Sequence, residues 1–173
     1  MSSLVVYFSR AGSNWVKDGV ANIDKGNTEI LAEYIAKKVN ADVFKIQTNQ
    51  VYTNDYRKCT EEAQEELNNN FRPEILDCPE NLDKYDTIYI GYPIWWGTFP
   101  TAVFAFLEKF NWKDKTIYPF CTHEGSGLSN SVNDLKTICK DATIKSFFET
   151  RGYTCQNFEE YNLASKLDEW VGK

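Results

Sequence analysis

Three segments of this chain, each directly after an apolar run, carry the residue types that could do chemistry. The first begins at Ser9-Arg10-Ala11 and resumes at Gly26-Asn27-Thr28, where a helical pattern starts. Hydroxyls, an amide and the amino end of a helix supply the converging donors that bind a phosphate group. An ordinary helix cap at Asn27 or Thr28 is the alternative interpretation.

The phosphate expected in this segment is a monophosphate. No Gly-Lys-Ser/Thr sequence follows, so the segment is not a Walker A loop, and it lacks the Gly-x-Gly-x-x-Gly dinucleotide fingerprint. A hydroxyl-lined loop with Arg10 as an optional cation suits a dianionic phosphate that is held mainly by neutral donors.

The second segment is a loop that holds two adjacent tryptophans, Trp95 and Trp96, within the sequence 91–100. Loops run over the protein surface, so two indoles in this place predict a flat ligand that covers them. The alternative is that one indole packs beneath a helix, since tryptophans are highly buried on average. The sequence does not indicate which indole stacks on a ligand, and Trp15 is a further aromatic candidate.

The third segment, residues 122–127, reads Thr-His-Glu-Gly-Ser-Gly. Its glycines would let a ring approach the main chain closely, and its amides and hydroxyl could bind the ring edge. An ordinary turn into a helix is the alternative. His123 is the single histidine of the chain, and no catalytic role or metal site is predicted from it.

The hydrophobic pattern predicts the elements that would position these segments. Short apolar runs predict buried strands, and apolar residues at helical spacing predict amphipathic helices. The strands are expected at 4–8, 41–48, 87–92, 116–121 and 144–153, and the helices at 28–39, 55–70, 100–110, 128–139 and 162–171. This alternation predicts a three-layer α/β sandwich, an open parallel sheet with helices on both faces. Ligands bind such sheets beyond the carboxyl ends of the strands, where all three segments lie.

Composition limits the classes of partner. A chain of 173 residues with 42% hydrophobic content supports one domain, expected over residues 1–173. A net charge of −6 disfavours nucleic acid and anionic membranes, which would be repelled, and suits a basic partner protein.

The five cysteines include no Cys-x-x-Cys pair, so neither a disulfide framework nor a zinc site is predicted. The apolar run 4–8 is too short to span a bilayer, and no secretion signal is evident. A reducing, cytoplasmic location is therefore expected.

The chain resembles the flavodoxin family, most closely the bacterial branch that carries Tyr-Pro-Ile-Trp-Trp-Gly. The matching residues are Ser9-Arg10-Ala11, 26–29, 92–97 and 122–127, and the resemblance extends over residues 3–173. It implies a five-stranded sheet in the order 2-1-3-4-5, with FMN where the strand order reverses. The family's phosphate loop is compact, whereas residues 12–25 are inserted into it here.

The resemblance also implies the cofactor-binding residues. The FMN phosphate would lie on Ser9, Arg10, Ala11, Asn27 and Thr28. The isoalloxazine ring would lie between two loops, namely Pro93, Ile94, Trp95, Trp96 and Gly97 on one side and Thr122, His123, Glu124, Gly125, Ser126 and Gly127 on the other.

Three functions are compatible with this resemblance. The favoured one is a flavodoxin, a low-potential electron carrier whose acidic face docks with redox partner proteins. The alternative is an FMN-dependent reductase that takes hydride from a nicotinamide cofactor and passes it to a quinone. The third is a binding module that has lost its flavin.

Overall fold

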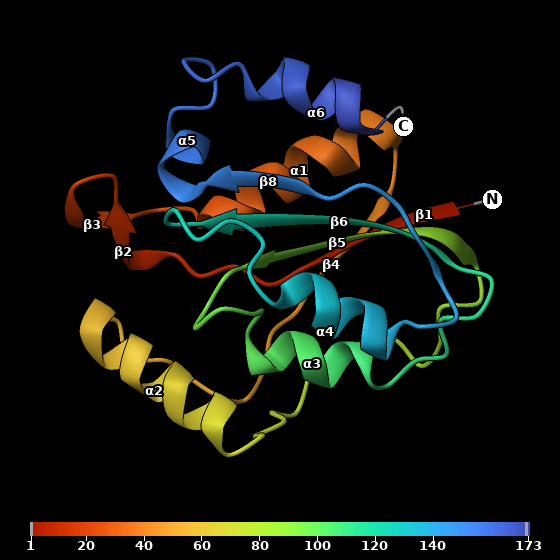
Figure 1. The fold of residues 1–173 in the computed structure, drawn as a ribbon, viewed down its shortest axis with the longest axis horizontal. Coiled ribbons are helices and arrows are strands. Elements are labelled where there is room, and N and C mark those ends of the chain that lie inside the picture. The colour runs from red at the N-terminus through yellow and green to blue at the C-terminus, as the bar shows by residue number, and fades with distance from the viewer. Residues whose placement is uncertain (1, 172) are drawn as a thin grey trace.

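The central sheet contains six parallel strands (Figure 1). The structure, a computed structural model, describes residues 2–171 and 173. Strands β4, β1, β5 and β6 are hydrogen-bonded in that order, and β7 and β8 both pair with β6. The strands are β1 (Ser2–Tyr7), β4 (Asp42–Lys45), β5 (Tyr85–Pro93), β6 (Thr116–His123), β7 (Thr143–Ile144) and β8 (Phe148–Arg151).

Helices cover both faces of this sheet (Figure 1). Alternate residues of β1 point to opposite faces, so Val6 packs in one core with α3 and α4, and Val5 packs in the other with α1 and α6. The helices are α1 (Asn27–Val39), α2 (Tyr56–Asn68), α3 (Thr101–Leu107), α4 (Ser131–Ile138), α5 (Gly152–Gln156) and α6 (Leu163–Val171). The predicted three-layer α/β fold and its strand order are confirmed.

The fifth predicted strand, at 144–153, is wrong in detail, because it is split and ends early. Residues 143–144 and 148–151 pair with β6 in two pieces, and residues 152–156 form α5. The amide of Lys145 donates to the carbonyl of Ile117 at 2.8 Å. The next bond of a parallel ladder would need the amide of Pro119, which has no N–H, so the pairing is interrupted there.

The inserted segment forms a separate antiparallel hairpin of β2 (Gly12–Val16) and β3 (Gly19–Ile23). A two-residue turn joins the strands, with Lys17 at φ 44°. The hairpin and α2 lie at the end of the sheet where the parallel strands finish (Figure 1). Asp55 caps α2 by accepting the Lys58 amide at 2.9 Å. Both segments are therefore placed to form walls around a site at that edge.

Within the described residues, none of the helices combines the length and the apolar character that crossing a bilayer requires.

Candidate functional site

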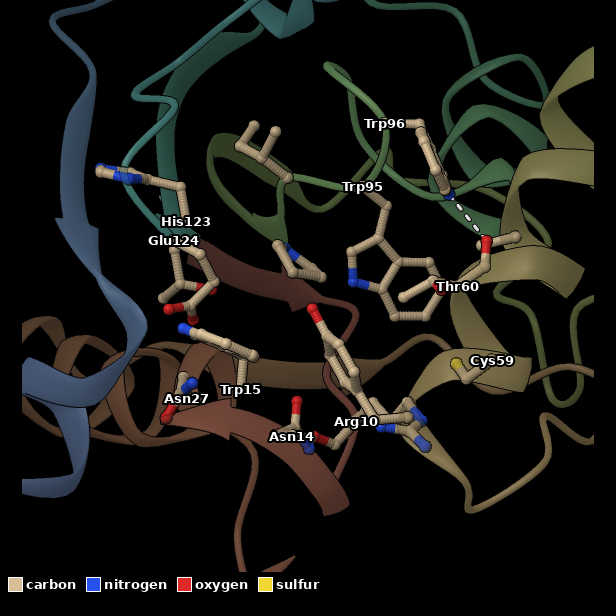
Figure 2. Close-up of a pocket in the computed structure, with 15 residues that line it drawn as sticks. Arg10, Asn14, Trp15, Asn27, Cys59, Thr60, Trp95, Trp96, His123 and Glu124 are labelled. Atoms are coloured by element: carbon tan, nitrogen blue, oxygen red, sulfur yellow. Dashed lines mark hydrogen bonds between the residues drawn. The ribbon is translucent and has the colours of Figure 1, made fainter. Parts of the chain in front are cut away.

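A cavity of about 370 Å³, here called the main cavity, lies beyond the ends of β1, β5 and β6 (Figure 2). The three segments singled out in the sequence meet around it. The predicted site residues that line it are Arg10, Asn27, Pro93, Ile94, Trp95, Trp96, Thr122, His123 and Glu124. Its volume falls in the range of small-molecule sites, roughly 300 to 1,000 Å³.

Seven predicted site residues belong to the same loops without lining the main cavity. They are Ser9, Ala11, Thr28, Gly97, Gly125, Ser126 and Gly127. Trp15, the further aromatic candidate, also lines the cavity. The sequence motifs did not indicate its remaining walls, formed by Asn14, Tyr56, Cys59, Thr60 and Ala63. In α2, the buried residues Cys59 and Ala63 are four apart and share one helix face. That spacing was the available signal that α2 faces something.

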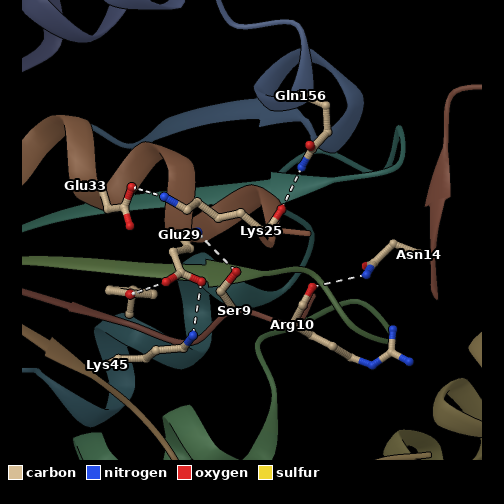
Figure 3. A network of polar contacts seen from close by, with 9 residues as sticks. Ser9, Arg10, Asn14, Lys25, Glu29, Glu33, Lys45 and Gln156 are labelled. Carbon is tan, nitrogen blue, oxygen red and sulfur yellow. Dashed lines mark hydrogen bonds and ion pairs between the residues drawn. The ribbon is translucent and has the colours of Figure 1, made fainter. Parts of the chain in front are cut away.

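The start of α1 presents backbone donors toward the first loop. The Glu29 amide donates to Ser9 Oγ at 3.1 Å (Figure 3). The Ile30 amide donates to the Gly26 carbonyl at 3.2 Å. The amides of Asn27 and Thr28 precede the first intrahelical bond, and no acceptor for them lies within residues 2–171. Two backbone N–H groups at the positive end of the helix therefore lack a partner, and of the two residues Asn27 lines the main cavity whereas Thr28 is buried beside it.

Gly26 allows the first loop to lie close to this helix end. A Cβ at this position would lie 2.1 Å from Ser9 Oγ and 2.9 Å from the carbonyl oxygen of Arg10. Any larger residue would push the loop away. The side chain of Asn27 is oriented by α5, because its Oδ1 accepts the Gln156 amide at 2.8 Å. Its Nδ2 group remains as a further donor.

The carboxylate of Glu29 is paired on the sheet side of the helix. Its two oxygens contact the Lys45 ammonium at 3.0 Å and the Tyr7 hydroxyl at 3.2 Å (Figure 3). Burial, reinforced by this carboxylate, raises the pKa of Tyr7, so the hydroxyl stays protonated and donates. The pairing offsets a negative charge that would otherwise oppose an anion at this helix end.

Arg10 fastens the hairpin to the segment before α2. Its guanidinium donates to the carbonyls of Thr53 and Asn54, at 3.0 and 2.9 Å, and also to the carbonyl of Ser13. Within residues 2–171 it has no carboxylate partner. Its positive charge at the cavity wall is therefore balanced only by main-chain dipoles.

The two tryptophans belong to a tight turn, Trp95 at its first position and Trp96 at its second. Trp96 and Gly97 have positive φ values, 55° and 81°, and the Trp95 amide donates to the Thr98 carbonyl at 2.7 Å. Two successive positive φ values are typical of a type I′ turn, in which glycine is favoured at the second of these two residues. This backbone directs both indoles to the main cavity from one loop.

The two indoles have different environments. Trp95 packs edge-on against Phe8 and Tyr52, with ring centroids 5.2 and 5.3 Å away. Trp96 is 50% exposed, and its Nε1–H donates to the Thr60 carbonyl of α2 at 2.7 Å. Trp95 is thus held by other aromatic rings. The hydrogen bond of Trp96 to Thr60 joins the loop to α2 (Figure 2).

His123 is nearly buried and held at both ring nitrogens. Its Nδ1 accepts the Gly125 amide at 2.9 Å, and its Nε2 contacts the Glu149 carboxylate of β8. An Nδ1 that accepts leaves the proton on Nε2, facing Glu149. The ring therefore fixes the third loop against β8.

Glu124 lies beside Asn27 at the opposite wall from α2. A Cβ on Gly152 would lie 2.4 Å from Asn27 Nδ2 and 2.7 Å from Glu124 Oε1, so both side chains converge on that glycine. Burial raises the pKa of Glu124 to about 7, and the Arg151 guanidinium opposes the rise. Glu124 is therefore only partly ionised at neutral pH.

The cavity has no feature of nucleophilic or metal catalysis in the described part of the chain. Burial raises the pKa of the Cys59 thiol, which keeps it protonated and unreactive. All five cysteines are free thiols. No group of three or more His, Cys, Asp or Glu residues that could hold a metal is found among residues 2–171 and 173.

An open parallel sheet with an aromatic cavity at its carboxyl edge and a free helix amino end defines a flavodoxin-like α/β protein. The family model described as flavodoxin matches residues 3–156, and the chain belongs to this family. A search of curated protein sequences gave no significant match.

Solved structures agree with this assignment. A Bacteroides eggerthii structure, provisionally described as a flavoprotein, is 30% identical, with 92% of this chain and 96% of that chain covered and a TM-score of 0.70. A Bacteroides uniformis structure with the same description is 27% identical, with the same coverage and a TM-score of 0.71. A flavoprotein in complex with FMN from Lactobacillus acidophilus shares the fold at 18% identity, with 98% of each chain covered and a TM-score of 0.64.

Proposed function

We propose that this protein binds one FMN non-covalently in the main cavity and serves as a flavodoxin, an electron carrier between redox proteins. The observation that carries the proposal is the placement of the start of α1, where the Asn27 and Thr28 amides lack an acceptor, beside a cavity lined by Asn27, Trp95 and Trp96. A phosphate-binding helix end next to flat aromatic walls matches the two chemical halves of FMN.

The phosphate would be held mainly by neutral donors of the first loop and α1. These are the two open amides, the Ser9 hydroxyl and Asn27 Nδ2. Arg10 supplies positive charge from the cavity wall without a carboxylate partner. Hydrogen bonds to an ionised group contribute about 1.5 to 3 kcal/mol each, so this set is sufficient to favour FMN over riboflavin.

The aromatic part of the cavity suits the isoalloxazine ring. Trp95 is fixed by Phe8 and Tyr52, and Trp96 is anchored to α2, so both walls are in place before a ring enters. Rigid walls reduce the ordering cost of binding. The third loop, held in place by His123, borders this part of the cavity through Thr122, His123 and Glu124.

When bound, FMN supplies one- and two-electron redox chemistry. The residues around it disfavour added negative charge, because indoles exclude water and Glu124 is itself a carboxyl group in the cavity wall. An environment that opposes negative charge lowers the reduction potential of its occupant. The proposed role is therefore transfer of electrons at low potential.

The proposed docking face for redox partners lies on α2 and the adjoining loop. Glu61 and Glu65 are exposed on α2, and the half-exposed Trp96 is hydrogen-bonded to the neighbouring Thr60. Together with the net charge of −6, these carboxylates favour a basic partner docking over the cavity wall. A partner in this position would approach the ring through Trp96.

The FMN-dependent reductase is kept as a second candidate because of one observation. A second pocket of about 450 Å³ lies next to the main cavity and shares Trp15, Tyr56 and Thr60 with it. A carrier needs no such space, whereas a reductase needs room for a small substrate beside its flavin.

Reduction under anaerobic conditions separates the two candidates. The FMN-loaded protein is mixed with NADH or NADPH and a benzoquinone, and separately with a flavoprotein reductase and a haem acceptor at low and high salt. A carrier requires the reductase, and its rate falls steeply with salt, since a Debye length of about 10 Å at about 0.1 M screens steering. Steady turnover of about 1 per second or faster in the first mixture would overturn the carrier proposal.

Variants locate the docking face. Replacing Glu61 and Glu65 by glutamine should slow electron transfer and weaken its salt dependence. Replacing the exposed Glu80 by glutamine removes the same kind of charge outside α2 and should change neither. Equal effects of both changes would contradict the docking face.

A further inference from the structure

A second pocket, here called the side pocket, lies between the inserted hairpin and the start of α2. Its volume is about 450 Å³, and its walls include Trp15 and Val20 of the hairpin and Tyr56 and Arg57 of α2. The hairpin forms its own two-stranded sheet, and α2 is a helix of the connection between β4 and β5. The side pocket is therefore built by parts of the chain that the parallel sheet does not require.

The side pocket and the main cavity share a wall. Trp15, Tyr56 and Thr60 line both, and Thr60 is also the acceptor for the Trp96 indole at 2.7 Å. An occupant of the side pocket would therefore contact the same aromatic pair that borders the main cavity.

Two aromatic rings give the side pocket flat surfaces. The rings of Trp15 and Tyr56 are 6.2 Å apart at an interplanar angle of 41°, so neither ring covers the face of the other. Trp15 is 38% exposed, and the neighbouring Val20 is 52% exposed. Large apolar side chains left open beside a pocket favour a planar apolar occupant.

One side of the pocket is positively charged. Among residues 2–171 and 173, the Arg57 guanidinium has neither an ion-pair partner nor a hydrogen-bond acceptor. The carboxylate of Asp55, which also lines the pocket, is engaged by the Lys58 amide at the helix end. An unpaired guanidinium beside aromatic faces recognises an anionic group through paired N–H donors.

We propose that the side pocket binds a planar aromatic anion, whose ring lies against Trp15 and Tyr56 and whose charge is bound by Arg57. That this site lies beside bound FMN rests on the proposed function. The binding site itself is formed by the hairpin and α2 and does not depend on FMN. Two sources of a flat ring joined to an anionic group are an aromatic sulfonate and a nicotinamide nucleotide, whose negative charge is on a phosphate linked to the ring through a ribose.

Titration of the FMN-loaded protein tests the proposal with two probes, anthraquinone-2-sulfonate and nicotinamide mononucleotide, followed by calorimetry. At least one probe should bind, and Arg57→Gln should weaken it about tenfold or more, as loss of a charge-assisted contact does. Val20→Glu, which places a negative charge in the side pocket alone, should weaken it to a similar extent. An uncharged anthraquinone should be insensitive to Arg57→Gln.

Two controls match these variants. Lys58→Gln is the control for Arg57→Gln, because it removes a neighbouring positive charge of α2 and Lys58 does not line the side pocket. Val43→Glu is the control for Val20→Glu, because Val43 on β4 is 51% exposed and lies outside the pocket. Both should bind the probes within about twofold of the unmodified protein. The proposal is wrong if neither probe binds at 1 mM, or if Arg57→Gln and Val20→Glu bind as well as the controls.

The same titration distinguishes this failure from failure of the proposed function. FMN content is measured first for every variant. It should stay unchanged, because none of the four changes alters a residue that lines the main cavity. If the protein does not bind FMN, the FMN proposal fails, and the probes are titrated onto the flavin-free protein with the same four variants. Loss of binding in Arg57→Gln and Val20→Glu alone supports the side pocket in either case.

Discussion

The hydroxyl of Thr28, at the start of α1, lies 2.9 Å from the hydroxyl of Thr122, at the end of β6, and both side chains are buried. This contact joins the phosphate segment to the third loop across 94 residues of sequence. The side chain of Thr28 therefore faces the protein, and its backbone amide is the group left without an acceptor among the described residues.

Replacing Thr28 by valine should lower stability without changing cofactor preference. The change leaves the buried Thr122 hydroxyl without its partner, which costs about 1 to 3 kcal/mol in the free energy of unfolding. Urea denaturation measures the loss, and the double variant Thr28→Val/Thr122→Val should recover most of it. The ratio of FMN to riboflavin affinity should stay within about threefold. A tenfold loss of FMN affinity alone would show instead that the hydroxyl binds phosphate.

The sequence predicted which loops meet, and long-range packing decided which of their atoms face the cavity. Strand periodicity and helical spacing are local signals, so the sheet order and the three loops could be predicted. The Thr28–Thr122 pair could not, because it depends on the packing of α1 against β6. For α2, the sequence predicted the helix at 55–70, and only the four-residue spacing of Cys59 and Ala63 signalled that one face of it lines the cavity.

Backbone chemistry accounts for the other differences. Pro119 is present in the sequence, but whether it interrupts a strand pairing depends on the side of β6 that its missing N–H would face. In the fold that side is occupied by β7 and β8. The inserted segment carries a hairpin pattern only weakly, since Lys17-Asp18 is not a preferred turn pair for positive φ. These features are decided by partners that local periodicity does not reveal.

Trp95 and Trp96, two of the three tryptophans that line the main cavity, should report flavin binding by fluorescence. Bound FMN should quench tryptophan emission, and Trp95→Phe or Trp96→Phe should remove most of the quenching, because both indoles line the main cavity. Trp112 and Trp170 are buried elsewhere, with Nε1–H bonds to the carbonyls of Leu107 and Ser146. Trp112→Phe is therefore the control and should leave the quenching unchanged. Trp15 also lines the main cavity, so quenching that survives Trp95→Phe, Trp96→Phe and Trp15→Phe alike would place the ring elsewhere.

Glu124 should make stability depend on pH. Its pKa is raised from 4.5 to about 7 in the folded protein, so the folded state binds the additional proton between these values. The free energy of unfolding therefore loses this contribution as the pH rises from about 4.5 to about 7. Glu124→Gln should remove the decline, as measured by denaturation at stepped pH, whereas the exposed Glu80→Gln should retain it. Parallel profiles for Glu124→Gln and the unmodified protein would contradict the assignment.

The turn should require glycine at position 97 because of its positive φ, and not because a side chain would clash with a neighbouring atom. Its φ is 81°, and a Cβ there would meet no atom within 4 Å, so Gly97→Ala should cost about 1 to 2 kcal/mol through the left-handed conformation alone. Gly19 is equally open but has no positive φ, so Gly19→Ala is the matched control with little effect. Equal thermal stability of the two variants would contradict this explanation of the turn.

The central claim, that the main cavity binds FMN with its phosphate at the start of α1, is tested most directly by one titration. Flavin-free protein is titrated with FMN and with riboflavin, and the stoichiometry and both dissociation constants are measured by fluorescence. We predict one FMN per chain, bound at least tenfold more tightly than riboflavin, with Asn27→Ala reducing the affinity for FMN and leaving that for riboflavin within about threefold. Equal affinities for the two flavins, or no binding of either, would contradict the account.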